Sequence, residues 1–232
     1  QTIRKGIKSA LFYPVTLVVV TLLITYGMLT KVVPTFTEMY KGMGKKLPGP
    51  TQVIVDASDW ILNGWNVLSI IGVVIAIKVI HNQLFKRVYN YKKMINIIFL
   101  KLPIMGNIIV KSTVARLSLL MANLFAAGIG VEEILRVSSR ITPNVVFVEA
   151  MGRISERIVS GVELSSLFAE EPIFPLELSQ LIKVGEKTGN MDEMLSSIAR
   201  YYQEEFEATV EGLTSMIEPI MIVFVGALIG AM

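Results

Sequence analysis

The chain contains no cysteine and a single histidine, His81. The absence of cysteine excludes a disulfide, a thiolate metal site and a cysteine nucleophile. One histidine excludes a metal site built from several histidines of this chain. Charged residues make up only 18% of the 232 residues, below the roughly 25% of soluble domains, and 53% of the residues are apolar. With a mean hydropathy of +0.60, this composition indicates a membrane protein.

Acidic residues are scarce in the first half of the chain. Residues 1–111 hold 14 Lys/Arg against 3 Asp/Glu, whereas residues 161–232 hold 3 Lys/Arg against 12 Asp/Glu. The net charge of +3 therefore hides a strong asymmetry. We expect a basic, apolar first half and an acidic later segment.

Three uncharged runs are candidate membrane spans. Residues 9–30 form a run of 22 residues, which exceeds the about 20 needed to cross a bilayer and tolerates Pro14 near its start. Residues 60–77 form a run of 18, with Trp60 and Trp65 as interfacial anchors; a buried helix of a soluble core is the alternative. Residues 219–232 are too few to cross the core, so we expect a third span cut short, in a fragment of a longer protein.

Basic residues predict the orientation, because cytoplasmic loops are rich in Lys and Arg. Arg4, Lys5 and Lys8 precede the first run, and the second is followed, with no acid between them, by Lys78, Lys86, Arg87, Lys92, Lys93 and Lys101. We therefore expect, in chain order, a cytoplasmic lead-in and transmembrane helix at 1–34, a periplasmic loop at 35–60, a transmembrane helix at 61–80, a basic cytoplasmic connector at 81–101, a cytoplasmic helical-bundle domain at 102–212 and the start of a truncated third transmembrane helix at 213–232.

The predicted cytoplasmic domain is all-α, an antiparallel bundle of six helices. Its first helix follows Pro103, carries an apolar stripe and ends at Gly128 and Gly130. A helix over 131–141 stops before Thr142 and Pro143, which we expect to cap and begin the next helix. The residues expected to point inward in these helices are Ala115, Leu119, Ala122, Ala126, Val145, Val148, Ile154 and Ile158.

The second half of this domain begins with a short helix over 164–170. The next helix opens after Phe174-Pro175 and runs to Gly189. Asn190 then caps a last long helix, with Asp192 and Glu193 in the first turn, where the helix dipole favours acids. This helix runs through an acidic stretch toward Pro219.

No catalytic, cofactor or metal site is recognisable. Two glycine-rich segments, 42–46 and 185–189, lack the full phosphate-loop pattern and its strand–helix context. The two complete candidate spans have no ionisable residue at their centres, which argues against an ion-coupled carrier and favours a scaffold. A multi-pass small-solute transporter subunit remains the alternative function. An intramembrane enzyme would need paired catalytic residues in the spans, which we do not find.

Three surface features suggest partners. Glu204, Glu205 and Glu207 form either a solvated helix face or a docking surface for a basic partner, and a divalent ion bridging such carboxylates has no support. The basic stretch 78–101 is interleaved with aromatic residues, and its place beside a span favours anionic lipids over nucleic acid. Gly226 and Gly230 form a small-xxx-small motif, which lets transmembrane helices approach each other closely. The motif marks either a subunit contact in a homo-oligomer or internal packing.

Motifs along the whole chain resemble one family, the polytopic inner-membrane platform proteins of bacterial type IV pilus assembly and type II secretion. The most specific stretch is Phe174-Pro175 followed by Gly185-Glu186-Lys187-Thr188-Gly189-Asn190-Met191-Asp192-Glu193-Met194-Leu195. The other matching stretches are Tyr13-Pro14, Val32-Val33-Pro34, Leu47-Pro48-Gly49-Pro50, Leu102-Pro103-Ile104-Met105-Gly106, Leu124-Phe125-Ala126-Ala127-Gly128 and Glu218-Pro219.

The resemblance implies a non-enzymatic, multi-pass protein of the bacterial inner membrane with its main domain in the cytoplasm. It implies two homologous cytoplasmic bundles and three spans, of which this chain lacks the first bundle and the end of the last span. The implied partners are a hexameric assembly ATPase, pilins or pseudopilins, and other inner-membrane assembly proteins. We favour the pilus over the secretion system.

Residue roles expected from these patterns are structural. We expect Pro175 to open a helix, Gly185 and Gly189 to shape the turn before the long helix, and Gly189 to need a positive φ. Glu186 is the best candidate for a polar contact that fixes this turn or meets a partner. Pro219 marks the start of the last apolar run.

Overall fold

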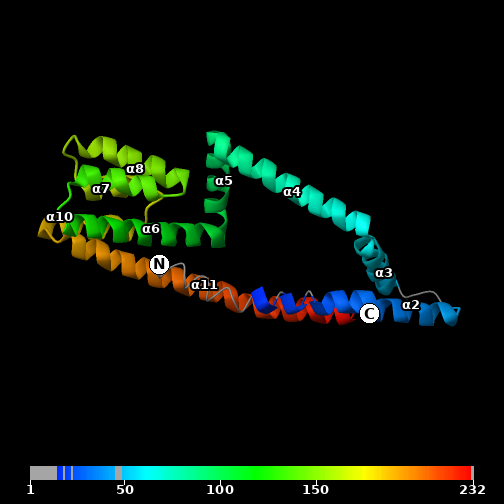
Figure 1. The fold of residues 1–232 in the computed structure, drawn as a ribbon. Helices are drawn as coiled ribbons and strands as arrows, with labels where there is room; N and C mark the ends of the chain where they lie inside the picture. The colour runs from blue at the N-terminus through cyan, green and yellow to red at the C-terminus, as the bar shows by residue number, and fades with distance from the viewer. Residues whose placement is uncertain (1–14, 18, 22, 45–48, 231–232) are drawn as a thin grey trace. The chain divides into compact units, whose positions relative to one another are not determined.

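The computed structural model describes residues 15–17, 19–21, 23–44 and 49–230, and it contains no strand within these ranges (Figure 1). The all-α class is confirmed. The helices that can be given bounds are the π-helix η1 (Met28–Val32), α2 (Val33–Gly42), α3 (Gly49–Leu62), α4 (Gly64–Arg87), α5 (Tyr89–Lys101), α6 (Pro103–Ala126), α7 (Val131–Ile141), α8 (Val145–Ile158), α9 (Leu164–Glu170), α10 (Leu176–Thr188) and α11 (Met191–Gly230).

The chain divides into two compact units. One comprises Leu84–Thr209, and the other comprises Gln1–Gln83 together with Val210–Met232. Within the first unit, α5 packs against α6 and α8, so it belongs to the same body as the helices that follow it.

The core of the Leu84–Thr209 unit is built from one face of each of the helices α6 to α11. Its largest fully buried side chains are Met121, Ile134, Leu135, Phe147, Met151, Ile154, Leu164, Leu167, Phe168, Ile182, Leu195 and Ile198. Phe174, in the connection between α9 and α10, packs edge-to-face on Phe147 and Phe168, with ring centroids 5.5 and 4.8 Å apart. This aromatic cluster fixes the start of α10 on α8 and α9.

Three residues that we expected to point inward, Leu119, Ala126 and Val148, are exposed instead. Leu119 is 46% exposed and Val148 is 37% exposed. On α6 the buried positions include Ala115, Ser118 and Ala122, spaced by three and four. Leu119 follows the buried Ser118 by one residue. One residue rotates the side chain by about 100° around the helix axis, which directs Leu119 away from the core. The sequence supplied apolar residues on more than one helix face, so the pattern alone did not select the buried one.

The predicted cap at Thr142 is wrong. Asn144 is the N-cap of α8, and its side-chain oxygen accepts the backbone N–H of Val146 at 2.9 Å. Thr142 is the C-cap of α7, and its hydroxyl donates to the carbonyl of Ser138. Thr142 is extended, as an N-cap would be, but α8 begins two residues later than expected, so Pro143 precedes the helix and Asn144 supplies the cap.

Several helix ends follow the predicted punctuation. α6 begins at Pro103 and is followed by Gly128 with φ +72°, and α7 and α9 have the predicted bounds. α11 continues through Pro219 to Gly230, so the third apolar run is the end of one long helix.

The other unit contains the apolar helices on which the predicted spans fall. The predicted 35–60 loop is largely helical, because it contains most of α2 and α3. The run 60–77 is interrupted at Asn63, whose side-chain oxygen accepts the N–H of Trp65, while the Asn66 amide donates to the carbonyl of Trp60. The uninterrupted helix, α4, starts later and extends to Arg87.

Within the described part of the chain, two helices are long and apolar enough to cross a membrane, Val15–Tyr40 and Pro103–Ala126, and Ile71–Phe85 is a shorter apolar helix. The first covers the described part of the predicted 9–30 span, of which residues 9–14, including Pro14, and residues 18 and 22 lie outside the described residues. Pro103–Ala126 is α6, and its apolar residues Val114, Leu117 and Met121 line the core of the Leu84–Thr209 unit.

Candidate functional site

The turn between α10 and α11 contains the segment with the most specific sequence motif. Gly189 is the C-cap of α10 with φ +78°, and its N–H donates to the carbonyl of Gly185 at 2.8 Å. Such a left-handed helix end favours glycine because a side chain would crowd the backbone. The predicted positive φ at Gly189 is confirmed, and this turn sets where α11 starts.

Gly185 allows α10 and α11 to approach closely beside this turn. The residue is buried, and a Cβ built on it would lie 3.0 Å from both the Cα and the sulfur of Met191. Because one of these atoms is backbone, a larger residue would push the first turn of α11 away from α10. Gly185 and Gly189 therefore act together to define the helical hairpin.

Glu186, in the last turn of α10, bonds to a third helix, α9. Its Oε1 and Oε2 atoms accept the backbone N–H groups of Leu164 at 2.6 Å and Ser165 at 3.2 Å, which are the first two residues of α9. The N-cap residue of α9, Glu163, makes no side-chain cap bond. A carboxylate at this position satisfies two free donors and complements the positive end of the helix dipole.

The neighbouring motif residues lie at helix starts. Pro175 is the N-cap of α10 and has extended backbone. Asn190 precedes α11; its carbonyl accepts the N–H of Met194, and its own N–H donates to the Thr188 hydroxyl. Capping by the Asn190 side chain stays a prediction. The motif thus surrounds one junction, at which α9, α10 and the start of α11 are held together.

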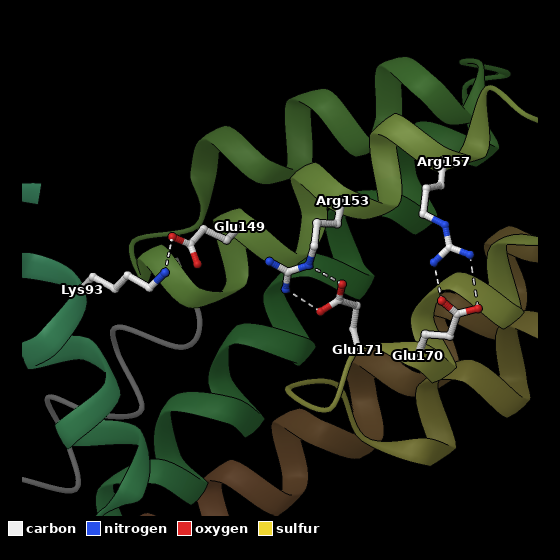
Figure 2. Close-up of polar contacts among 6 residues, drawn as sticks. All are labelled: Lys93, Glu149, Arg153, Arg157, Glu170 and Glu171. Carbon is white, nitrogen blue, oxygen red and sulfur yellow. Dashed lines mark hydrogen bonds and ion pairs between the residues drawn. The ribbon is translucent and has the colours of Figure 1, made fainter. Parts of the chain in front are cut away.

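A row of charged residues on α8 ties two other segments to it, α5 and the end of α9 (Figure 2). Glu149, Arg153 and Arg157 are four residues apart on one helix face. Arg153 forms a two-point ion pair with Glu171, with its Nε 2.7 Å from Oε1 and its Nη2 2.6 Å from Oε2, and Arg157 pairs with Glu170. This contact fastens the C-terminal end of α9 to α8, as capping by Glu186 fastens its beginning to α10.

The remaining member of the row, Glu149, joins α8 to α5. Its Oε1 lies 2.8 Å from the Lys93 ammonium and 2.5 Å from the Tyr89 hydroxyl. The hydrogen bond from Lys93, followed by that from Tyr89, lowers the pKa of Glu149, and the bond to Glu149 raises the pKa of Tyr89. Spacing by four could have identified the row from the sequence, but not its partners on other helices.

The predicted docking acids of α11 have different surroundings. Glu205 pairs with Lys111 of α6 at 2.8 Å, and the same ammonium bonds to the Thr209 hydroxyl at 3.0 Å. Glu207 accepts a hydrogen bond from Gln203 one turn before it, and Glu204 is exposed. Glu205 is therefore a structural contact between α6 and α11, whereas Glu204 and Glu207 stay available on the surface.

A tyrosine next to these acids also holds α11 in place. Tyr202 is 5% exposed, and its hydroxyl donates to Oε2 of Glu177 on α10 at 3.1 Å. Burial, with the nearby Glu177 carboxylate, raises the pKa of Tyr202 well above its ordinary value. Sequence reasoning missed this contact because no local spacing links the two residues.

The remaining predicted sites lie in the unit formed by Gln1–Gln83 and Val210–Met232. Pro219 is exposed within α11, and a Cβ built on Gly226 or Gly230 would meet no described atom within 4 Å. A subunit contact at the two glycines stays a prediction. Across the described ranges, no group of three or more His, Asp or Glu side chains is placed to hold a metal ion.

The sequence profile of the family described as "Type II secretion system (T2SS), protein F" matches residues 117–232, which is half of the chain and includes the α9–α11 junction. The chain belongs to this family. Membership confirms the resemblance noted from the motifs.

Relatives of this family extend the match over the whole chain. It is 34% identical over 232 residues to "Type IV pilus assembly protein PilC" of Pseudomonas aeruginosa, covering 100% of this chain and 62% of the relative. It is 31% identical to the PilC protein of Myxococcus xanthus, covering 99% and 54% of the two chains. It is 26% identical to "Type II secretion system protein F" of Pseudomonas aeruginosa, covering 99% and 56%. The chain thus spans little more than half the length of these relatives.

Proposed function

We propose that the chain acts in a non-enzymatic, inner-membrane platform protein of a type IV pilus or type II secretion machine. The observation that carries this proposal is the family match, with 34% identity over the full chain to a pilus assembly protein. The identity to a secretion relative is lower, at 26%. This difference supports pilus assembly as the more specific assignment.

Exposed apolar helices support a membrane location. α4 exposes large apolar side chains at successive positions around the helix, among them Val73, Val74, Ile75 and Ile77. The helix Val15–Tyr40 and the last part of α11 do the same, at Val19, Val20, Leu23, Ile24, Ile220, Ile222, Val223 and Phe224. A helix that is apolar all round needs an apolar environment on every side, which a bilayer provides.

The Leu84–Thr209 unit is the proposed cytoplasmic domain. Its helices α6 to α11 form the proposed antiparallel bundle, and the Lys/Arg-rich residues 78–101 at its start support a cytoplasmic location. α4 and the end of α11, which flank it in the chain, are the proposed second and third spans.

The proposed role is to couple a cytoplasmic hexameric ATPase to the assembly of pilins or pseudopilins. Glu204 and Glu207 of α11 are the acids proposed to dock a basic surface of the ATPase, because they are the two of the predicted three that do not bond to another helix. The variant Glu204→Lys/Glu207→Lys should reduce capture of the ATPase from membranes. Glu156→Lys, an exposed reversal on α8, is the matched control.

The experiment that tests the platform role is complementation. The complete gene is deleted from its host and returned as wild type or with residues 84–209 removed, and surface pili, secreted proteins and pilin levels are measured. The wild type should restore assembly, and the deletion variant, inserted normally, should leave pilins synthesised but unassembled. Pilus assembly and secretion that both persist without the gene would refute the proposal.

A further inference from the structure

The corner between α5 and α6 exposes an unusual amount of apolar surface. Six apolar side chains there are between 41% and 50% exposed, on α5, at the bend and in the first turn of α6: Met94, Ile98, Phe99, Leu102, Ile104 and Met105. We call these six residues the apolar corner. α5 has no buried residue, although it packs on α6 and α8. Clustered exposed apolar residues mark surfaces that contact a partner or a membrane.

The corner is a built feature of the fold. α5 ends at Lys101, Leu102 is extended, and α6 begins at Pro103 in a different direction (Figure 1). A Cβ built on Gly106 would lie 2.1 Å from the carbonyl oxygen of Leu100, so the bend requires glycine at this position. The bend brings the end of α5 against the first turns of α6 and keeps both arms of the corner in one fixed arrangement.

The charged residues on the two helices that form the corner have one sign. Residues 60–131 contain no Asp or Glu. Arg87 and Lys101, which flank α5, are exposed, and Lys92 is half-buried with its ammonium 5.8 Å from the centre of the Phe85 ring. Lys93 differs, because Glu149 neutralises it. An apolar surface bordered by unneutralised cations matches an anionic lipid surface, with its phosphates above its acyl chains.

Chain connectivity limits how far the start of α5 can lie from the membrane. α5 begins at Tyr89, four residues after the apolar helix Ile71–Phe85 ends. Four residues extend at most about 14 Å. The headgroup layer on each side of a bilayer is roughly 5–8 Å thick. If α4 crosses the membrane, as the proposed function has it, α5 starts in or next to the headgroup layer.

We propose that the apolar corner lies on the anionic cytoplasmic surface of the bilayer. Its apolar side chains enter the boundary between headgroups and acyl chains, while Arg87, Lys92 and Lys101 lie at the level of the lipid phosphates. This inference rests on the proposed membrane location of α4. The cations that border the corner match anionic headgroups, and connectivity starts α5 at the headgroup layer, so lipid is the occupant that the observations favour.

The absence of cysteine allows a direct test, because one introduced cysteine gives one labelled site. The full chain, spin-labelled at Ile98→Cys or Met105→Cys, is reconstituted into vesicles of equal parts phosphatidylcholine and phosphatidylglycerol. Accessibility to oxygen, which concentrates in lipid, is compared with accessibility to a water-soluble nickel chelate. Matched controls are Val159→Cys, just after α8, and Leu176→Cys, at the start of α10, which are 69% and 63% exposed on the same unit.

We expect an oxygen-to-nickel accessibility ratio several-fold higher at positions 98 and 105 than at 159 and 176. The ratio should fall toward the control values in vesicles of phosphatidylcholine alone, and in a Lys92→Glu/Lys101→Glu background. Labels at 98 and 105 that are as accessible to nickel as the controls would overturn the proposal. Labels that are immobile and shielded from both reagents would also overturn it, because they would show that protein covers the corner.

A label at Ile75→Cys, within α4, separates this proposal from the proposed function. A lipid-exposed label at 75 with water-exposed labels at 98 and 105 would reject the corner proposal alone. A water-exposed label at 75 would reject the membrane location of α4, and with it the basis of both proposals.

Discussion

The Oε1 atom of Glu186 lies 2.6 Å from the backbone nitrogen of Leu164, twenty-two residues earlier in the chain. The bond makes a side chain of α10 the cap of α9. Because Glu186 belongs to the segment with the family's most specific motif, this capping gives that residue a structural role that does not require a partner protein.

Replacing Glu186 tests the cap directly. Glu186→Ala removes both acceptors of the Leu164 and Ser165 N–H groups and should lower the free energy of unfolding by about 0.5–2 kcal/mol. Glu186→Gln keeps one acceptor oxygen, so the free energy of unfolding should fall by less than in the alanine variant. Chemical denaturation of the purified chain measures both, with Lys183→Ala, exposed on the same helix, as the control. Equal stability of the alanine variant and the wild type would contradict capping.

Gly189 should be replaceable only by residues that accept left-handed backbone. At φ +78°, Gly189→Val should cost at least about 1–2 kcal/mol and misdirect α11, and Gly189→Asn should cost less. Unfolding midpoints and piliation or secretion by the complemented strain provide the measurements. Normal assembly with a fully inserted valine variant would refute the requirement for this turn.

Replacing Gly106 or Gly152 by alanine should change the stability of the protein in opposite directions. Gly106→Ala places a Cβ against the carbonyl of Leu100 and should destabilise the α5–α6 corner by about 1–3 kcal/mol. Gly152→Ala, within α8, meets no atom within 4 Å and should stabilise by about 0.5–1 kcal/mol through helix propensity. Thermal unfolding of the two variants gives the comparison, and a stabilising Gly106→Ala would show that the bend is less tight than described.

A charge swap should reveal the pair between α6 and α11. Glu205→Lys places two ammonium groups together and should destabilise by about 0.2–1 kcal/mol, because the pair is partly exposed. The double variant Lys111→Glu/Glu205→Lys should recover part of this loss. A double-mutant cycle on unfolding free energies isolates the coupling, and strict additivity of the two single variants would exclude an interaction.

The contact between α5 and α8 should weaken in acid. Hydrogen bonds from Lys93 and Tyr89 lower the pKa of Glu149 below its ordinary value of 4.5, so their stabilisation is complete above pH 4.5 and is lost as the pH falls through the lowered value. Glu149→Gln should therefore flatten the acid side of the stability–pH curve. Glu156→Gln, exposed on the same helix, is the control. Parallel curves for wild type and Glu149→Gln would reject this linkage.

Local signals in the sequence predicted most helix ends. Contacts between residues far apart in the chain could not be predicted in this way. Pro103, Gly128 and Gly189 act on their own backbone, so their effects can be predicted from position alone. The partners of Glu186 and Glu205 lie on other helices, 22 and 94 residues away, and no local pattern predicts them. Thr142 and Asn144 both favour the N-cap position, so the local pattern around Pro143 did not select between them.

Attachment at both ends has a consequence for the short helix α9. Its seven residues are too few for an isolated helix to persist in water. Glu186 holds its beginning, and Arg157 and Arg153 hold Glu170 and Glu171 at its end. Local opening of α9 must therefore break contacts to both α8 and α10, so its amide protons should exchange with solvent at the slow rate of those neighbours rather than at the fast rate of a fraying segment.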